Sequence, residues 1–300
     1  MLANFFGKSK PVNFIVLFAL FLCYFLIGIF FKEFSINLFK ELAWFIVLFA
    51  VYNFIIAKNQ LTFDNSFAFL FLVLLIGFFR DTIAINTTFY ASLTVLLFLR
   101  KVYSLQTNKK TFHKLFDGGL WLGISFLIEP YTAFFTVLLY ASIYLHQRFT
   151  YQTLLIPVVG FIAPVLLYFT YCFWYDNTAD FLALFQWKYA FDISFYSQSK
   201  FVFSIVFISV FLLISLLLKT PKTLAISNKF KRSWILILIH LSISVLVLLL
   251  TEDKTGTEFL YVLFPVSIIL ANGLELFQKT IYADVILLLF LLASFGEFLL

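Results

Sequence analysis

Long apolar segments separated by short polar stretches run through the whole chain. A hydrocarbon core of about 30 Å needs roughly 20 apolar residues in a helix, and fewer where flanking residues snorkel or the bilayer thins. On that measure the pattern predicts eleven transmembrane helices, several of them short. Their expected ranges are 13–31, 42–57, 65–79, 83–99, 115–128, 131–145, 154–174, 201–218, 234–250, 258–276 and 281–299.

The composition supports a membrane protein rather than a soluble one. The chain is 63% hydrophobic and 12% charged, compared with about 45–50% and about 25% in soluble globular domains. The first apolar segment is too long for the core of a signal peptide and has no small-residue cleavage site, so we expect it to be retained. The expected fold is therefore all-α, a polytopic transmembrane helical bundle.

The distribution of positive charges tests this predicted topology, because Lys and Arg are retained on the cytoplasmic side of a membrane. With the N-terminus inside, the predicted spans place 15 of the 21 Lys and Arg residues on the inner side. The stretches 100–114 and 219–233 hold most of them, and adding or removing one central span would put these stretches on opposite sides. The net charge of +6 thus reports orientation, and we expect no nucleic-acid partner. The outer side receives Lys32, Lys40, Arg80, Lys188, Lys200 and Lys254.

Acidic residues show the opposite distribution. Four of the 15 fall at or near the inner side, namely Asp64, Asp117, Glu275 and Asp284. The other acidic residues fall on the outer side, where the sequence therefore places any chemistry. These are Glu33, Glu41, Asp81, Glu129, Asp176, Asp180, Asp192, Glu252, Asp253, Glu258 and Glu297.

A charged residue interrupts the apolar stretch GISFLIEPYTAFF at 123–135. Proline disfavours helical geometry in the residue before it, so the helix is expected to end at Glu129. Glu129 and Pro130 then form a tight outer bend between the fifth and sixth spans. Two interpretations of Glu129 stay open, a solvated turn charge or a carboxylate that lines a functional cavity.

Arg80 and Asp81 follow the third span directly, at the outer interface. Arg80 either pairs with Asp81 or holds a lipid phosphate through its planar fork of donors. The first outer connection supplies two further carboxylates, Glu33 and Glu41.

The longest outer connection, residues 174–200, is rich in aromatic residues. Phe181, Leu184, Phe185 and Tyr189 recur at three- and four-residue spacing, which predicts a short amphipathic helix in the interface. The aromatic residues are either an interfacial belt or rings that stack on sugars. Candidate substrate-binding residues in this connection are Trp187 and Lys188.

Two further polar residues fall within or beside predicted spans. His240, about two turns into the ninth span, is either a proton relay or an imidazole hydrogen-bonded between helices. Asp117 begins the fifth span, where a carboxylate complements the helix dipole. Cys23 and Cys172 lie in separate apolar runs and suggest no disulfide or metal spacing.

Several enzyme and transporter signatures are absent from the sequence. It holds no P-loop, no HExxH and no GxSxG, which argues against soluble-type ATPases, zincins and hydrolases. No internal repeat with matching Gly/Pro-broken helices is visible, which disfavours a secondary transporter.

Residues 65–178 resemble the membrane core of GT-C glycosyltransferases. The likeness lies in a span ending in LLFLR before a basic loop, in the GISFLIEPYTAFF hairpin, and in the GFIAPVLLYF span that leads to an aromatic outer segment. The whole chain, with its start MLANFFGKSKPVNF, also looks like an uncharacterised family of bacterial integral membrane proteins of about this length.

The GT-C resemblance implies transfer of a sugar from a polyprenyl-phosphate donor on the outer face of the membrane. It implies a general base or metal ligand in the first outer loop, here Glu33 or Glu41, and a phosphate contact at Arg80. A divalent metal ion is a possible cofactor on this pattern. The first loop lacks the usual adjacent acidic pair, and Glu129 stands where many relatives carry a basic residue.

The resemblance divides the chain into a GT-C-like seven-span module, residues 1–200, and a four-span module, residues 201–300. The expected function is a polyprenyl-phosphate-sugar-dependent glycosyltransferase of a bacterial inner membrane, N-terminus cytoplasmic and C-terminus periplasmic. The alternative is a non-enzymatic GT-C-like subunit or lipid-binding scaffold of a cell-envelope complex. Its partners would be membrane lipids, a polyprenyl-phosphate-linked sugar or another membrane protein.

Overall fold

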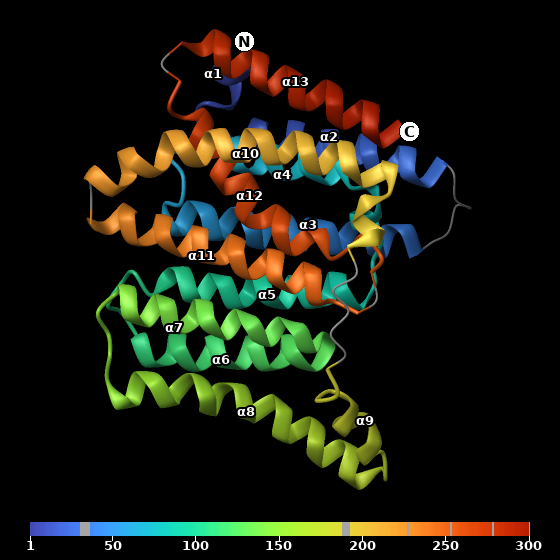
Figure 1. The fold of residues 1–300 in the computed structure, drawn as a ribbon, viewed down its shortest axis with the longest axis vertical. Coiled ribbons are helices and arrows are strands. Elements are labelled where there is room, and N and C mark those ends of the chain that lie inside the picture. The colour runs from blue at the N-terminus through green and yellow to red at the C-terminus, as the bar shows by residue number, and fades with distance from the viewer. Residues whose placement is uncertain (31–36, 188–192, 227, 253, 278, 300) are drawn as a thin grey trace.

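The computed structural model describes residues 1–30, 37–187, 193–226, 228–252, 254–277 and 279–299, and these contain helices and no strand (Figure 1). The α-helices are α1 Leu2–Phe6, α2 Pro11–Phe30, α3 Asn37–Asn59, α4 Phe67–Phe78, α5 Thr87–Ser104, α6 Thr111–Ile128, α7 Thr136–Leu145, α8 Tyr151–Trp174, α9 Thr178–Ala183, α10 Ser199–Ile226, α11 Asn228–Leu250, α12 Phe259–Leu274 and α13 Thr280–Leu299. Short 3-10 helices are η1 Arg80–Ile83, η2 Pro130–Phe135 and η3 Ser194–Ser197.

Each apolar segment of the sequence coincides with a helix, which confirms the all-α fold class. Six of these helices, α2, α3, α8, α10, α11 and α13, are long and apolar enough to cross a membrane by themselves. The helices α4, α7 and α12 are shorter. The structure is therefore that of a membrane-type helical protein, and the number of crossings stays a prediction.

The long helices lie side by side with their axes roughly aligned (Figure 1). From top to bottom of the view, α13 is followed by α10, α2 and α4, then by α12, α3 and α11, then by α5, α7 and α6, and last by α8. The α5–α6 connection, the C-terminal end of α10 and the N-terminal end of α11 lie at one end of this bundle, at the left of the view. We name it the basic end, because it carries residues 100–114 and 219–233. The opposite end, with the α6–α7 and α11–α12 connections, is the acidic end.

Ion pairs agree with this division. Four pairs within the described residues each join two groups that the sequence pattern assigns to the same side. They are Lys200 with Asp81 at the acidic end, and Lys101 with Asp117, Lys219 with Glu275 and the N-terminal amine with Asp284 at the basic end. Three of the four carboxylates assigned to the inner side, Asp117, Glu275 and Asp284, thus have a cationic partner at the same end.

The centre of the bundle is built from α4 and α12. All twelve residues of α4 are buried, and α12 is buried along nearly its whole length. A helix that is apolar all round is stable only where other elements surround it, and α4 packs against α2, α12 and α13. These two short helices are therefore enclosed by protein rather than by solvent or lipid.

By contrast, α8 at the edge of the bundle attaches through one narrow face. Its large apolar residues are mostly exposed, whereas Gly160 and Pro157 are buried. A Cβ at Gly119 of α6 would lie 2.1 Å from the carbonyl oxygen of Pro157, and one at Gly160 would lie 2.3 Å from that of Phe116. Small residues let the two backbones touch, as in membrane helix pairs. The outward face of α8 is therefore suited to contact with lipid.

The bend at Glu129 is confirmed. Helix α6 ends at Ile128, and Glu129 adopts an extended conformation with φ −139° and ψ 100° before Pro130. The chain then continues as η2 and α7. The amphipathic helix expected near 181–189 is shorter than predicted: α9 ends at Ala183, and Tyr189 lies outside the described residues.

Candidate functional site

The acidic end holds two cavities that contain sequence-predicted site residues. The first has a volume of about 860 Å³ and lies between the ends of α4, α10 and α13. Charged side chains of both signs and aromatic rings share its walls. The lining residues are Phe78, Arg80, Asp81, Ser199, Lys200, Phe201, Phe203, Ala293, Gly296 and Glu297.

Arg80 and Asp81 reach this cavity because α4 stops at Phe78 and the chain turns through η1. The Asp81 carboxylate accepts a hydrogen bond from Lys200 Nζ at 2.9 Å. The guanidinium carbon of Arg80 lies 5.8 Å from the centroid of the Phe298 ring. Asp81, which the sequence offered as a partner for Arg80, thus pairs with Lys200.

The connection from α11 to α12 passes directly beside Asp81. Gly256 there has φ +90°, which side chains rarely tolerate. A Cβ at Gly256 would also lie 2.7 Å from Asp81 Cβ. Glycine is therefore required at this position on both counts, and it fixes how closely the loop approaches η1.

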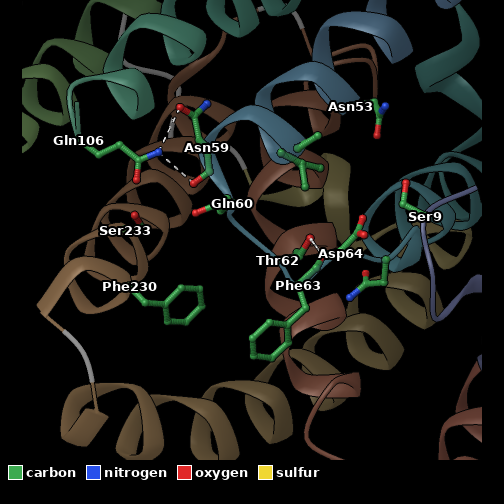
Figure 2. A pocket seen from close by; sticks show the side chains of 13 residues that line it. Ser9, Asn53, Asn59, Gln60, Thr62, Phe63, Asp64, Gln106, Phe230 and Ser233 are labelled. Atoms are coloured by element: carbon green, nitrogen blue, oxygen red, sulfur yellow. Dashed lines mark hydrogen bonds between the residues drawn. The ribbon is translucent and has the colours of Figure 1, made fainter. Parts of the chain in front are cut away.

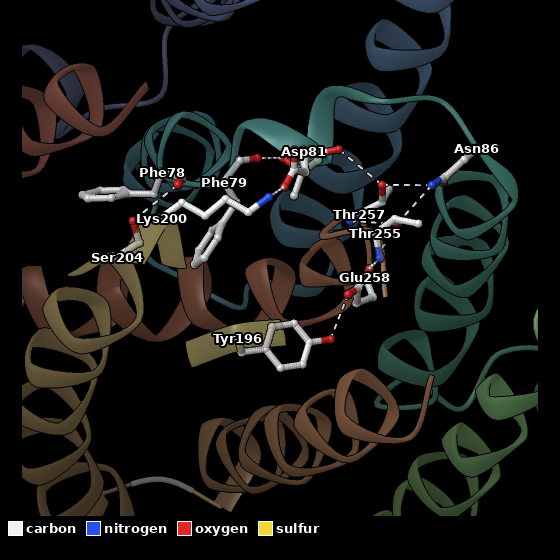
Figure 3. A network of polar contacts seen from close by, with 11 residues as sticks. Phe78, Phe79, Asp81, Asn86, Tyr196, Lys200, Ser204, Thr255, Thr257 and Glu258 are labelled. Atoms are coloured by element: carbon white, nitrogen blue, oxygen red, sulfur yellow. Dashed lines mark hydrogen bonds and ion pairs between the residues drawn. The ribbon is translucent and has the colours of Figure 1, made fainter. Parts of the chain in front are cut away.

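Hydroxyl and amide groups join the same loop to α5 (Figure 3). The Asn86 side chain caps α5 by accepting from Phe89 N at 3.0 Å, and its Nδ2 donates to Thr257 Oγ1 at 3.0 Å. Thr257 Oγ1 in turn donates to the carbonyl oxygen of Asp81 at 3.2 Å. This network holds η1, α5 and the start of α12 in fixed relative positions.

A buried carboxylate anchors the loop from beneath. Glu258 is fully buried, and its Oε1 accepts from Tyr196 OH at 2.8 Å while its Oε2 accepts from Thr255 N at 3.2 Å (Figure 3). Burial and the nearby Glu258 charge raise the pKa of Tyr196 well above its ordinary value. Tyr196 therefore remains a protonated donor at physiological pH.

The second cavity, of about 380 Å³, lies beside the Glu129 bend. Trp187 packs against Tyr131 and Phe134, with ring centroids 6.1 and 5.5 Å apart, and donates its indole N–H to the Leu184 carbonyl at 3.0 Å. The wall thus combines carboxylates, amides and an oriented indole. The lining residues are Asn86, Thr87, Thr88, Ile128, Glu129, Pro130, Tyr131, Ala183, Leu184, Gln186, Trp187, Glu252 and Thr255.

The sequence-predicted site residues therefore fall into separate groups. Arg80 and Asp81 line the first cavity, and Glu129 and Trp187 line the second. Glu41, in the first turns of α3, lines neither of them. Glu33 and Lys188 lie outside the described residues.

Sequence reasoning missed three residues that organise this end, because each had been counted only as part of a pattern. In the sequence pattern, Lys200 is one of six outer cations and Glu258 is one of the outer acids. Asn86 begins the triplet Asn86-Thr87-Thr88, which only matches the short acceptor pattern of N-glycosylation. The dense polar stretch TEDKTGTE at 251–258 was the available signal for Glu258. Nothing in the sequence alone places Lys200 beside Asp81, which lies 119 positions away.

No cluster of three or more His, Cys, Asp or Glu side chains suited to a metal ion occurs among the described residues. The first cavity is lined by two carboxylates, Asp81 and Glu297, and by two cations, Arg80 and Lys200. This mixture of charges suits a ligand with both anionic and hydroxyl groups.

Comparison with known proteins yields one match. The sequence model of a family described as "Family of unknown function (DUF6427)" matches residues 1–298. Neither the curated proteins nor the solved structures contain a match to this chain. The match agrees with the second sequence resemblance, to an uncharacterised family, and leaves the GT-C resemblance a prediction.

Proposed function

Since this chain belongs to the DUF6427 family, whose description carries no activity, we propose a function from the site itself: binding of a lipid phosphate head group in the cavity at the acidic end. The observation that supports it is the presence of two cations, Arg80 and Lys200, in a cavity whose other walls include Phe78, Phe201 and Phe203. A membrane-embedded lipid needs this combination, charge for its head and apolar surface for its chain.

The side chains of Arg80 and Lys200 suit a phosphate group in their geometry, and the Lys200–Asp81 pair is exposed enough for a ligand to reach it. A guanidinium presents a planar fork that matches phosphate oxygens, and an ammonium adds a point charge. The Lys200–Asp81 pair is partly open, with side-chain exposed fractions of 52% and 36%, and exposed ion pairs contribute little stability. A phosphate can therefore replace Asp81 beside Lys200 at small cost, while Asp81 turns to a hydroxyl of the ligand.

The orientation follows from the charge bias. We place the protein in a bacterial inner membrane with eleven spans, the N-terminus in the cytoplasm and the C-terminus in the periplasm. The basic end then faces the cytoplasm, as retained positive charge requires. The acidic end and its cavity meet the outer leaflet, where a polyprenyl-phosphate or an anionic phospholipid would enter sideways.

We favour a non-enzymatic, lipid-binding role, the alternative that the sequence left open. Catalysis on the GT-C pattern needs a base beside the bound phosphate, and Glu41 does not line that cavity. The two-module division of the chain remains a hypothesis tied to the GT-C likeness.

A second candidate is glycosyl transfer from a polyprenyl-phosphate-linked sugar, supported by the second cavity. Glu129, Glu252 and Trp187 provide hydrogen-bond acceptors and a ring face for a sugar. In this scheme Glu33 or Glu41 supplies the general base, as the resemblance implies, and the candidate residues Trp187 and Lys188 bind the substrate. A divalent metal ion would serve as its cofactor.

Native mass spectrometry of the full chain in mild detergent tests the proposed binding. Polyprenyl phosphate and phosphatidylglycerol are titrated separately, with phosphatidylcholine as the zwitterionic reference. We expect one of the two anionic lipids to bind at 1:1 stoichiometry, and the double substitution Arg80→Gln with Lys200→Met to weaken that binding at least tenfold. Lys40→Gln removes a positive charge from the same end outside the cavity and is the matched control.

Equal affinity for phosphatidylcholine, or equal weakening by Lys40→Gln, would contradict the binding proposal. The second candidate has its own readout, the release of polyprenyl phosphate from a labelled polyprenyl-phosphate sugar. Loss of that release in Glu41→Gln, with lipid binding unchanged, would favour the enzyme.

A further inference from the structure

Three polar atoms in the middle of the bundle are buried without a hydrogen-bond partner among the described residues: His240 Nε2, Ser244 Oγ and Tyr261 OH. His240 and Ser244 lie one turn apart on α11, and Tyr261 lies on α12. The Phe135 ring touches both helices, with its centroid 5.9 Å from that of His240 and 6.1 Å from that of Tyr261. The three atoms therefore belong to one region of the core.

A buried polar atom without a hydrogen-bond partner destabilises an otherwise apolar core. Each buried polar group without a partner lacks the hydrogen bonds that it makes to water in the unfolded chain, and this loss destabilises the folded state. Unpartnered polar groups in native interiors usually bind internal water or serve a function. An ionisable side chain within a membrane domain is a functional candidate in the same sense.

Polar groups continue from His240 toward the basic end. His240 Nδ1 lies 3.1 Å from Tyr103 OH on α5. One turn beyond Tyr103, Gln106 Nε2 donates to the Asn59 carbonyl at 3.1 Å. Gln106 and Asn59 line a cavity of about 580 Å³ at that end (Figure 2). Its other walls carry polar side chains, among them Asn53, Gln60 and Asp64.

Polar groups also continue toward the acidic end. Tyr261 lies one turn after Glu258, the N-cap residue of α12, and the Glu258 carboxylate accepts a hydrogen bond from Tyr196 OH at 2.8 Å. Glu129 lines the second cavity of that end. Polar side chains thus occur at intervals between the two ends of the bundle, at Glu258 and Tyr261 of α12, His240 of α11 and Tyr103 of α5.

We propose that this polar line, with internal water between its groups, conducts protons through the bundle. A hydronium ion on the acidic-end side gives a proton to His240 Nε2, while the Nδ1 proton passes to Tyr103 oxygen and the hydroxyl proton of Tyr103 passes to water on the basic-end side. The imidazole ring then flips by 180°, which turns its protonated nitrogen toward Tyr103, and the Tyr103 hydroxyl rotates back before the next transfer. One proton enters, one leaves, and the proton gradient supplies the direction.

Proton flux into proteoliposomes tests this path. The full-length protein is reconstituted in vesicles that contain a pH-sensitive dye, and a potassium gradient with valinomycin drives proton entry. We expect flux well above that of protein-free vesicles, and a reduction of at least fivefold in His240→Leu and in Tyr261→Phe.

Tyr24→Phe is the matched control, because it also deletes one buried hydroxyl, but one that is hydrogen-bonded to Ser294 at 2.8 Å outside the line. We expect it to keep the wild-type flux. Tyr261→Phe removes an unpartnered oxygen and is expected to keep or raise the thermal stability while it lowers the flux. A merely structural role for Tyr261 predicts the reverse, lower stability with unchanged flux.

Wild-type flux no greater than that of empty vesicles would overturn the proposal, and so would equal flux in wild type and Tyr261→Phe. If His240→Leu does not fold, the Tyr261→Phe result decides alone.

Discussion

Two of the three lysines of helix α10, Lys200 and Lys219, form ion pairs at opposite ends of the bundle and in different surroundings. Lys200, at the acidic end, pairs with Asp81 at 2.9 Å with exposed fractions of 52% and 36%. Lys219, at the basic end, pairs with Glu275 at 3.4 Å with exposed fractions of 6% and 4%. One helix thus carries two lysine–carboxylate pairs, one in an open cavity and one buried in the protein interior.

The buried pair is held by additional contacts. Glu275 also accepts from Phe63 N at 2.9 Å and from Asn65 Nδ2 at 2.7 Å. Lys219 Nζ lies 5.2 and 5.1 Å from the ring centroids of Phe63 and Phe230. These contacts fix the α3–α4 connection against the end of α12. The buried Lys219–Glu275 pair therefore holds these elements together, whereas the exposed Lys200–Asp81 pair leaves its charges available to a ligand.

The largest expected effect is that of breaking the buried pair. Lys219→Met leaves Glu275 buried without its cation, which costs about 3–5 kcal/mol of unfolding free energy. Lys219→Met with Glu275→Leu removes both charges and is expected to recover most of that loss. Denaturant unfolding in mixed micelles measures both. If Lys219→Met were as stable as the wild type, the Lys219–Glu275 pair would not differ from the exposed Lys200–Asp81 pair in its contribution to stability.

An intermediate effect is expected at the acidic end, where Glu258 is buried although the Asp81–Lys200 pair is not. Glu258→Gln replaces charged hydrogen bonds from Tyr196 and Thr255 by neutral ones, at a cost of about 1–3 kcal/mol. The same unfolding measurement applies, with Glu252→Gln as the comparison in the same loop. A loss as large as that of Lys219→Met would show that burial alone, and not the end of the bundle, sets the energy.

The smallest effect on stability is expected for Lys200→Met. An exposed ion pair contributes at most about 1 kcal/mol, so the unfolding free energy should change by no more than that. Lipid-phosphate affinity should fall in the same variant, because the cavity loses one of its two cations. A stability loss approaching that of Lys219→Met would indicate that Lys200 is structural.

The sequence was sufficient for features that depend on local chemistry. Apolar length located the long helices, and Pro130 indicated that α6 ends beside Glu129, which is its C-cap residue. Charge bias grouped residues 100–114 with 219–233, and both lie at one end of the bundle (Figure 1).

Features that depend on contacts between distant segments were not accessible in this way. The sequence does not show which helices are central. Both α4 and α8 are apolar segments, although α4 is enclosed by other helices and α8 is largely exposed. Lys200 beside Asp81 and Tyr196 beneath Glu258 are tertiary contacts, so no spacing in the sequence signals them. The same limit applies to the division of Arg80 and Glu129 between two cavities.

The proposed lipid binding requires that the basic end faces the cytoplasm, because the Arg80–Lys200 cavity then meets the outer leaflet. Single cysteines at Lys109, Lys222 and Asp180, in a background with Cys23→Ala and Cys172→Ala, test it with a membrane-impermeant maleimide on intact spheroplasts. We predict that position 180 is labelled in intact cells and that positions 109 and 222 are labelled only after lysis. Labelling of position 109 or 222 in intact cells, with position 180 protected, would contradict the orientation and the lipid entry built on it.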